Sequence, residues 1–161
     1  GGGGGGGAVE AMHVSLSRVF PIRRLDKEPL TRVVEKMVAR AGVGPFDVVL
    51  VLDELGFVAN DDGSRLFAVV GLESECAAMV GALIDAVDRA MTAYGLRRYY
   101  SERLIHSSVA VCDVDDRADD GGIDRSKPWL LGGSTISARV TDIELRMGNE
   151  VRCIRLPSAR E

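Results

Sequence analysis

Residues 46–72 read FDVVLVLDELGFVANDDGSRLFAVVGL, two apolar runs on either side of a polar turn. The first run, residues 46–53, is β-branched and nearly continuous, which is typical of a well-buried strand. Residues 55–59 predict a further strand. Residues 60–64 are a strong turn signal, because Asn, Asp, Gly and Ser each favour turn conformations. Residues 65–72 predict a strand on the far side of that turn.

Helical patterns lie on both sides of this stretch. Residues 27–41 carry apolar side chains at a spacing that gathers them on one stripe of a helix. Pro29 suits the first turn of that helix, and Gly42 suits its end. Residues 75–94 have the clearest helical spacing in the chain, and Gly95 is the predicted end.

Alternating polar and apolar residues predict the remaining strands. In residues 104–112 the alternation places His106, Ser108 and Ala110 on one face. Residues 113–127 are rich in aspartate and predict a solvated loop. The order of elements predicts an α+β fold with helices packed on antiparallel sheets. The other predicted strands are residues 12–20, 135–147 and 150–156, the last two joined by a turn at Gly148-Asn149.

The composition is that of a single globular domain. The 161 residues are 46% hydrophobic with a formal net charge of −4, which excludes a globally basic nucleic-acid coat but not a local basic groove. No apolar run approaches the roughly 20 residues that span a bilayer, so we expect no membrane partner. Three distant cysteines and two histidines argue against a disulfide framework and a structural zinc site. We predict a flexible glycine tract at residues 1–8, a folded domain at 9–157 and a tail at 158–161.

Two similar segments contain both histidines of the chain, His13-Val14-Ser15-Leu16 and His106-Ser107-Ser108-Val109. In a strand, His and Ser two residues apart point to the same face. Two such strands side by side would aim two imidazoles and two hydroxyls into one cleft. A single His-x-Ser pattern is common by chance, and a lone histidine is usually structural. The hypothesis of a site therefore depends on the pairing of the two segments.

These groups suit phosphodiester transfer without a metal or other cofactor. One neutral imidazole takes a proton from an attacking hydroxyl, and one protonated imidazole gives a proton to the leaving oxygen. The ordinary histidine pKa of about 6.5 allows both forms near neutral pH, and each positioned proton transfer contributes about 10²- to 10⁴-fold in rate. The serine hydroxyls would donate hydrogen bonds to the non-bridging phosphate oxygens.

Further motifs follow the tetrads in a fixed order. The first tetrad continues as HVSLSR to Arg18, and SRLF at 64–67 runs into VGLE at 70–73. Later come VD at 87–88, YGL at 94–96, YY at 99–100 and MGN at 147–149. Over residues 12–157 this set resembles the 2H phosphoesterase superfamily and, within it, the U6 snRNA phosphodiesterase family. The corresponding family motifs are HISLSR, TRTF-x-GLE, VD…FGL…YY and a closing GN hairpin.

The resemblance implies a metal-independent 3′-to-5′ exoribonuclease that trims the oligouridine 3′ end of U6 snRNA in the nucleus. Transesterification would leave a 2′,3′-cyclic phosphate, which some family members open. By position, His13 and His106 would be the general acid–base pair, Ser15 and Ser108 the phosphate-binding hydroxyls, and Tyr100 the base-stacking aromatic. The implied fold has two lobes, with antiparallel sheets facing a central cleft and helices outside. We expect uridine-rich RNA as the partner and a monomer.

The chain also departs from the family pattern. The family's strand and helix before the first tetrad, and its helix before the final hairpin, have no counterpart, so one lobe is expected to be incomplete. Ser107 occupies a normally apolar position. A catalytically weak RNA- or nucleotide-binding module therefore remains an alternative, as does another 2H reaction such as cyclic-phosphate hydrolysis or RNA end ligation. Six arginines are candidates for RNA backbone contacts, or else part of a solvated surface: Arg18, Arg23, Arg24, Arg97, Arg98 and Arg103.

Overall fold

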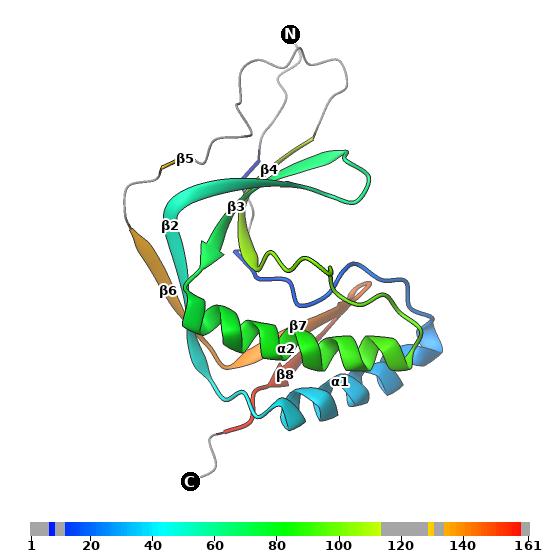
Figure 1. The fold of residues 1–161 in the computed structure, drawn as a ribbon. Helices are drawn as coiled ribbons and strands as arrows, with labels where there is room; N and C mark the ends of the chain where they lie inside the picture. Colours follow the sequence, from blue (N-terminus) through cyan, green and yellow to red (C-terminus); the bar gives the residue numbers. More distant parts are fainter. Residues whose placement is uncertain (1–6, 9–11, 114–128, 131–133, 159–161) are drawn as a thin grey trace. The chain divides into compact units, whose positions relative to one another are not determined.

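A computed structural model describes residues 7–8, 12–113, 129–130 and 134–158 (Figure 1). The chain divides into two units, each formed from three segments of the sequence. Unit 1 comprises Gly1–Val14, Val49–Glu73 and Ile105–Ile136, and unit 2 comprises Ser15–Val48, Ser74–Leu104 and Ser137–Glu161. No helix in these described ranges is long and apolar enough to cross a membrane.

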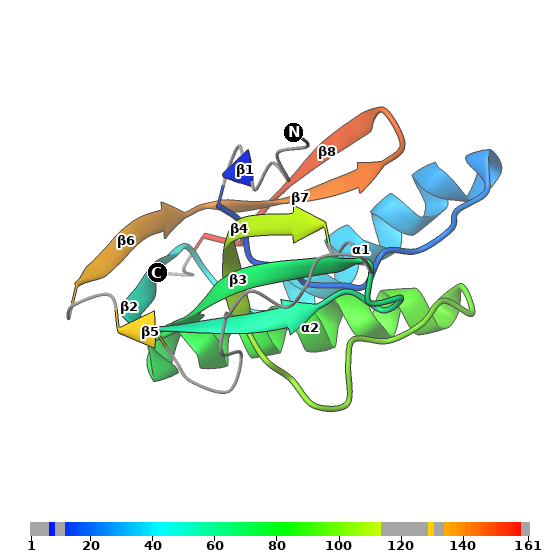
Figure 2. The same cartoon turned by 90° about the horizontal axis from the view of Figure 1, so that it is seen from above.

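The larger sheet has the strand order β1-β4-β3-β2-β5, and β6 also pairs with β2 (Figure 2). Strand β1 lies inside the predicted glycine tract and pairs with β4. The predicted acidic loop lies almost entirely outside the described residues. The strands are β1 (Gly7–Ala8), β2 (Phe46–Ala59), β3 (Arg65–Leu72), β4 (His106–Asp113), β5 (Trp129–Leu130) and β6 (Thr135–Val140).

The stretch that begins at Phe46 forms a β-hairpin, as its pattern predicts. The two predicted strands before the turn are one strand, β2, whose register against β3 shifts between Val51 and Leu55. In the turn, the Arg65 backbone N–H donates to the Asn60 side-chain carbonyl at 2.9 Å. Gly63 has a φ of +72°, a conformation that glycine adopts without steric cost.

Both predicted helices are confirmed, and they contact each other in unit 2 (Figure 1). Helix α1 spans Lys27–Ala41 and helix α2 spans Ser74–Ala93. Gly42 ends α1 with a φ of +68°, the left-handed conformation that glycine favours at a helix end. The apolar stripes are buried, and include Leu30, Val34 and Val38 on α1 and Val80, Leu83, Ile84, Val87 and Met91 on α2.

The predicted strand 135–147 is two strands. Strand β6 ends at Val140, and β7 (Asp142–Met147) pairs antiparallel with β8 (Glu150–Arg155). The break at Thr141 separates β6, which pairs with β2, from β7, which pairs with β8. The predicted turn is confirmed, with Gly148 at a φ of +67°.

Residues 12–20 do not form the predicted strand. One bridge joins Val14 to Ser107, and the chain bends at Leu16 and Ser17. Val19 is fully exposed, so the alternating pattern does not correspond to an inner and an outer face. The α+β class with antiparallel sheets is confirmed by the described elements, whereas the cleft between facing sheets stays a prediction.

Candidate active site

The second tetrad begins β4, beside β3. Gly71 pairs with His106, and Val70 pairs with Ser107. Paired residues share a face and neighbours along a strand alternate, so His106 and Ser108 lie on the Gly71 face and Ser107 lies on the opposite face. A Cβ at Gly71 would meet no atom within 4 Å. The position paired with His106 therefore has open space beside its backbone.

The prediction that Ala110 shares this face is wrong, because β4 contains a bulge. Ala68 pairs with Ala110, but the next residue of β3, Val69, pairs with Ser108, which leaves Val109 as an extra residue. Ala68 and Val69 are consecutive and point to opposite faces. Ala110 therefore lies on the face opposite to Ser108, and the bulge separates the tetrad from the rest of the strand.

The first tetrad meets the second at the antiparallel bridge between Val14 and Ser107. In this register, His13 and His106, which precede the two bridge partners, lie diagonally on the face opposite to that of the bridge. Diagonal neighbours are about 7–8 Å apart, within reach of long side chains. His13 is exposed, and His106 and Ser108 are half-buried. Unit 1 therefore brings together three of the five predicted site residues.

The other two predicted residues, Ser15 and Tyr100, belong to unit 2. Ser15 is exposed and directly follows Val14 in the chain. Tyr100 is 40% exposed. How these two side chains lie relative to the three in unit 1 stays a prediction.

Tyr100 has a neighbour that the sequence does not reveal. The guanidinium carbon of Arg18 lies 3.8 Å from the centre of the Tyr100 ring. Tyr99 meets Tyr100 edge to face, with ring centres 5.4 Å apart and an interplanar angle of 83°. Tyr99 is buried, which raises the pKa of its hydroxyl. No local pattern predicts a contact between residues 82 positions apart, although HVSLSR and YY both belong to the family's motifs.

Asp88 on α2 fixes the backbone beside this tyrosine pair. Its buried carboxylate accepts a hydrogen bond of 2.7 Å from the Tyr99 backbone N–H. The guanidinium groups of Arg98 and Arg103 lie 3.8 and 3.7 Å from the same carboxylate. The hydrogen bond between Asp88 and Tyr99 thus links the VD motif to the YY motif.

Several of the arginines flanking the tetrads engage carboxylates of the protein itself. Arg103 donates to Asp85 at 2.6 Å, and this hydrogen bond holds the pKa of the Asp85 carboxyl below its ordinary value. Arg23 donates to Asp26, also at 2.6 Å. These contacts favour a structural role for Arg23 and Arg103 over the predicted RNA contact.

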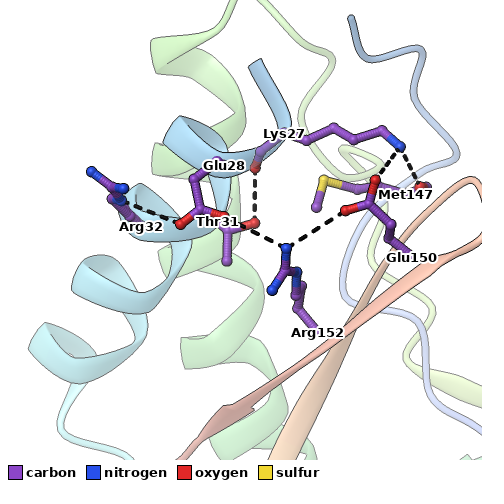
Figure 3. A network of polar contacts seen from close by, with 7 residues as sticks. All are labelled: Lys27, Glu28, Thr31, Arg32, Met147, Glu150 and Arg152. Atoms are coloured by element: carbon purple, nitrogen blue, oxygen red, sulfur yellow. Dashed lines mark hydrogen bonds and ion pairs between the residues drawn. The ribbon is translucent and has the colours of Figure 1, made fainter. Parts of the chain in front are cut away.

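A polar network in unit 2 joins the start of α1 to the β7–β8 hairpin (Figure 3). The Lys27 ammonium donates to the Met147 carbonyl at 2.9 Å and to the Glu150 carboxylate at 3.0 Å. The hydrogen bond from Lys27 lowers the pKa of Glu150. Arg152 lies 3.7 Å from Glu28 and 3.6 Å from Glu150, beside a cavity of about 140 Å³.

In the part of the chain that the structure describes, no group of three or more His, Cys, Asp or Glu residues is placed to hold a metal.

The chain is similar in sequence to known proteins. The sequence model of the HVSL family, described as an uncharacterised conserved protein, matches residues 6–155. U6 snRNA phosphodiesterase 1 of Dictyostelium discoideum is 26% identical over 98 residues, or 61% of this chain and 34% of that protein. The chain therefore spans about a third of the length, 34%, of this curated relative.

Two solved structures share the fold. The structure of Kluyveromyces marxianus Usb1 with uridine monophosphate aligns with a TM-score of 0.65 and 18% identity, over 90% of this chain and 75% of that chain. A second structure of Kluyveromyces marxianus Usb1 aligns with a TM-score of 0.66 and 18% identity, over 90% and 76% of the two chains. The match of the family model to residues 6–155 shows that the chain belongs to the HVSL family, which confirms the predicted membership of the U6 snRNA phosphodiesterase family.

Proposed function

We propose that this chain is a metal-independent RNA phosphodiesterase that shortens uridine-rich 3′ ends by transesterification. The observation that carries the proposal is the bridge between Val14 and Ser107. Its register supports a site in which His13 and His106 flank one phosphodiester on a common face. The relationship to U6 snRNA phosphodiesterase 1 and to a Usb1 structure with uridine monophosphate supports the choice of RNA.

The reaction uses the two imidazoles as a base and an acid. The neutral imidazole accepts the proton of the 2′-hydroxyl on the penultimate nucleotide, and that oxygen forms a bond to the phosphorus of the neighbouring 3′ phosphate. The bond from phosphorus to the 5′ oxygen of the terminal nucleoside breaks, and the protonated imidazole gives its proton to this oxygen. The products are a terminal nucleoside and an RNA that ends in a 2′,3′-cyclic phosphate.

The hydroxyls and the exposed tyrosine bind the substrate in this proposal. Ser108 lies on the His106 face of β4, and Ser15 holds the equivalent position in the first tetrad. Both hydroxyls donate hydrogen bonds to non-bridging oxygens, which gain charge in the transition state. Tyr100 stacks on the terminal base, an interaction of about 1–3 kcal/mol per base. U6 snRNA in the nucleus is the proposed substrate, and the active protein is proposed to be a monomer.

The test is incubation of the purified protein with oligouridine RNA in EDTA. We expect stepwise shortening, and a loss of about 10²- to 10⁴-fold in rate for His13→Ala and for His106→Ala. If either variant trims at the wild-type rate, the two-histidine mechanism is wrong. Ser107 and Ser108 provide a matched pair on opposite faces of β4. Ser108→Ala should slow trimming, and Ser107→Ala should not.

The same experiment separates the proposal from its alternatives. A cyclic phosphate on the shortened RNA supports trimming by transesterification alone, and a linear phosphate indicates that the ring is also opened. Binding of uridine monophosphate without any turnover would indicate a nucleotide-binding module. The isolated bridge at Val14 favours this second candidate, because one bridge fixes the backbone of the first tetrad less firmly than a continuous strand does.

A further inference from the structure

We propose that Arg18 is a positioning residue that holds the Tyr100 ring ready to stack on a nucleobase. The inference rests on the proposed function, because it takes Tyr100 as the group that contacts the base. It assigns to Arg18 a contact with the protein rather than with the RNA backbone. The expected consequence is an effect of Arg18 on nucleotide affinity rather than on the chemical step.

The geometry of the pair supports this assignment. The guanidinium carbon lies 3.8 Å from the centre of the Tyr100 ring, well inside the roughly 6 Å that defines a cation–π contact. A planar guanidinium stacks on an aromatic face, which an ammonium does not do. Tyr100 is 40% exposed, so without such a contact its side chain would lose more rotational freedom on binding a base.

The burial of Arg18 supports the same conclusion. Its Nε is buried and has no hydrogen-bond partner in the described part of the chain. An N–H group buried in this way has a desolvation cost that no hydrogen bond offsets. The contact with the Tyr100 ring is a favourable interaction of the same guanidinium group.

Tyr99, the other member of the tyrosine pair, is anchored to α2. Tyr99 meets Tyr100 edge to face, and Asp88 binds the Tyr99 backbone N–H at 2.7 Å. Tyr100 is thus contacted by one side chain from the tetrad segment and by one neighbour anchored to α2. Two contacts from different parts of unit 2 leave the ring a narrow range of orientations before any ligand arrives.

The chain also connects this ring to the proposed phosphate-binding group. Arg18 follows Ser15 by three residues, and three extended residues span at most about 10 Å. Both residues belong to unit 2. A nucleotide that places its phosphate at Ser15 and its base on Tyr100 would therefore depend on Arg18 for the second contact.

The experiment measures uridine monophosphate affinity by calorimetry, and KM and kcat for oligouridine trimming. We expect Arg18→Met to weaken binding about 3- to 20-fold and to raise KM similarly, with kcat changed less than 2-fold. Arg18→Lys keeps the charge but not the planar group, so its affinity should lie nearer to that of Arg18→Met than to wild type. Arg23→Met removes an arginine of the same unit that is paired with Asp26, and it should bind as wild type does.

A double-mutant cycle with Tyr100→Leu tests whether Arg18 acts through the ring. In the Tyr100→Leu background, Arg18→Met should have no further effect on affinity. If Arg18→Met weakens binding by the same factor in both backgrounds, or if Arg18→Lys binds as wild type does, the positioning role is refuted. Unchanged thermal unfolding midpoints for the Arg18 variants are the control for folding.

The binding assay also separates this inference from the proposed reaction, because it requires no turnover. If the wild-type protein binds uridine monophosphate with the expected pattern but does not trim RNA, the reaction is wrong and the role of Arg18 stands. If trimming depends on His13 and His106 but nucleotide affinity is the same in Arg18→Met, the reaction stands and the role is refuted. Absence of nucleotide binding to the wild-type protein also refutes the role.

Discussion

Replacing Asp88 with alanine should destabilise the protein by about 3 kcal/mol. The carboxylate is 3% exposed and accepts the Tyr99 backbone N–H at 2.7 Å. A hydrogen bond to a charged group contributes about 1.5–3 kcal/mol. The arginines near it, Arg98 and Arg103, are 68% and 33% exposed at 3.8 and 3.7 Å, so screening limits each to at most about 1 kcal/mol.

Asp88→Asn separates the hydrogen bond from the charge. The amide oxygen can still accept the Tyr99 N–H, so only the ionic part of the interaction is lost, about 1 kcal/mol. Asp85→Ala is the matched control on the same helix. Its carboxylate is 50% exposed and pairs with Arg103, and an exposed pair contributes at most about 1 kcal/mol.

Urea denaturation followed by circular dichroism measures these differences in the free energy of unfolding. The affinity for uridine monophosphate should fall in the same order, so Asp88→Ala should bind it less tightly than Asp88→Asn does. If Asp88→Asn is as destabilising as Asp88→Ala, the charge of Asp88 contributes more to stability than its hydrogen bond to Tyr99 does, which contradicts this prediction. If neither variant differs from wild type by more than about 0.5 kcal/mol, a change typical of surface sites, Asp88 does not fix the backbone at Tyr99.

Two further predictions concern stability. Ser107 is 1% exposed, and its hydroxyl has no hydrogen-bond partner in the described residues, so Ser107→Ala should raise the free energy of unfolding by about 1 kcal/mol. A loss of stability in urea denaturation would show that the hydroxyl is bonded. The Glu150 pKa is lowered mainly by its hydrogen bond from Lys27, so the stability that this carboxylate contributes is present above its ordinary pKa of 4.5 and is lost as the pH falls through the lowered value. The melting temperature of Glu150→Gln should therefore be below that of wild type at pH 7, and the gap should close in acid; a gap that persists at pH 2 contradicts this origin.

Elements with strong local signals could be predicted from the sequence. The spacing of Leu30, Val34 and Val38 predicted helix α1, and these residues are buried along it. Asn60 and Gly63 predicted the turn between β2 and β3, because their backbone and side-chain preferences act within five residues. The glycine that ends each helix was predicted on the same basis.

Features that depend on distant partners could not be predicted. The alternation of residues 12–20 is typical of a strand, but it gives no information on whether a neighbouring strand is available, and only Val14 found a partner. The bulge at Val109 depends on the register with β3. One extra residue reverses the face of every later side chain, so the sequence placed Ala110 on the wrong face.

The two tetrads could be recognised because they repeat the His-x-Ser pattern and together contain both histidines of the chain. Four residues separate His13 from Arg18, and five separate Tyr100 from His106. The chain passes between the two units inside both intervals, between Val14 and Ser15 and between Leu104 and Ile105. The first segment therefore carries a proposed acid–base group, His13, in unit 1 and the proposed positioning residue Arg18 in unit 2. The second carries His106 in unit 1 and the proposed base-stacking Tyr100 in unit 2.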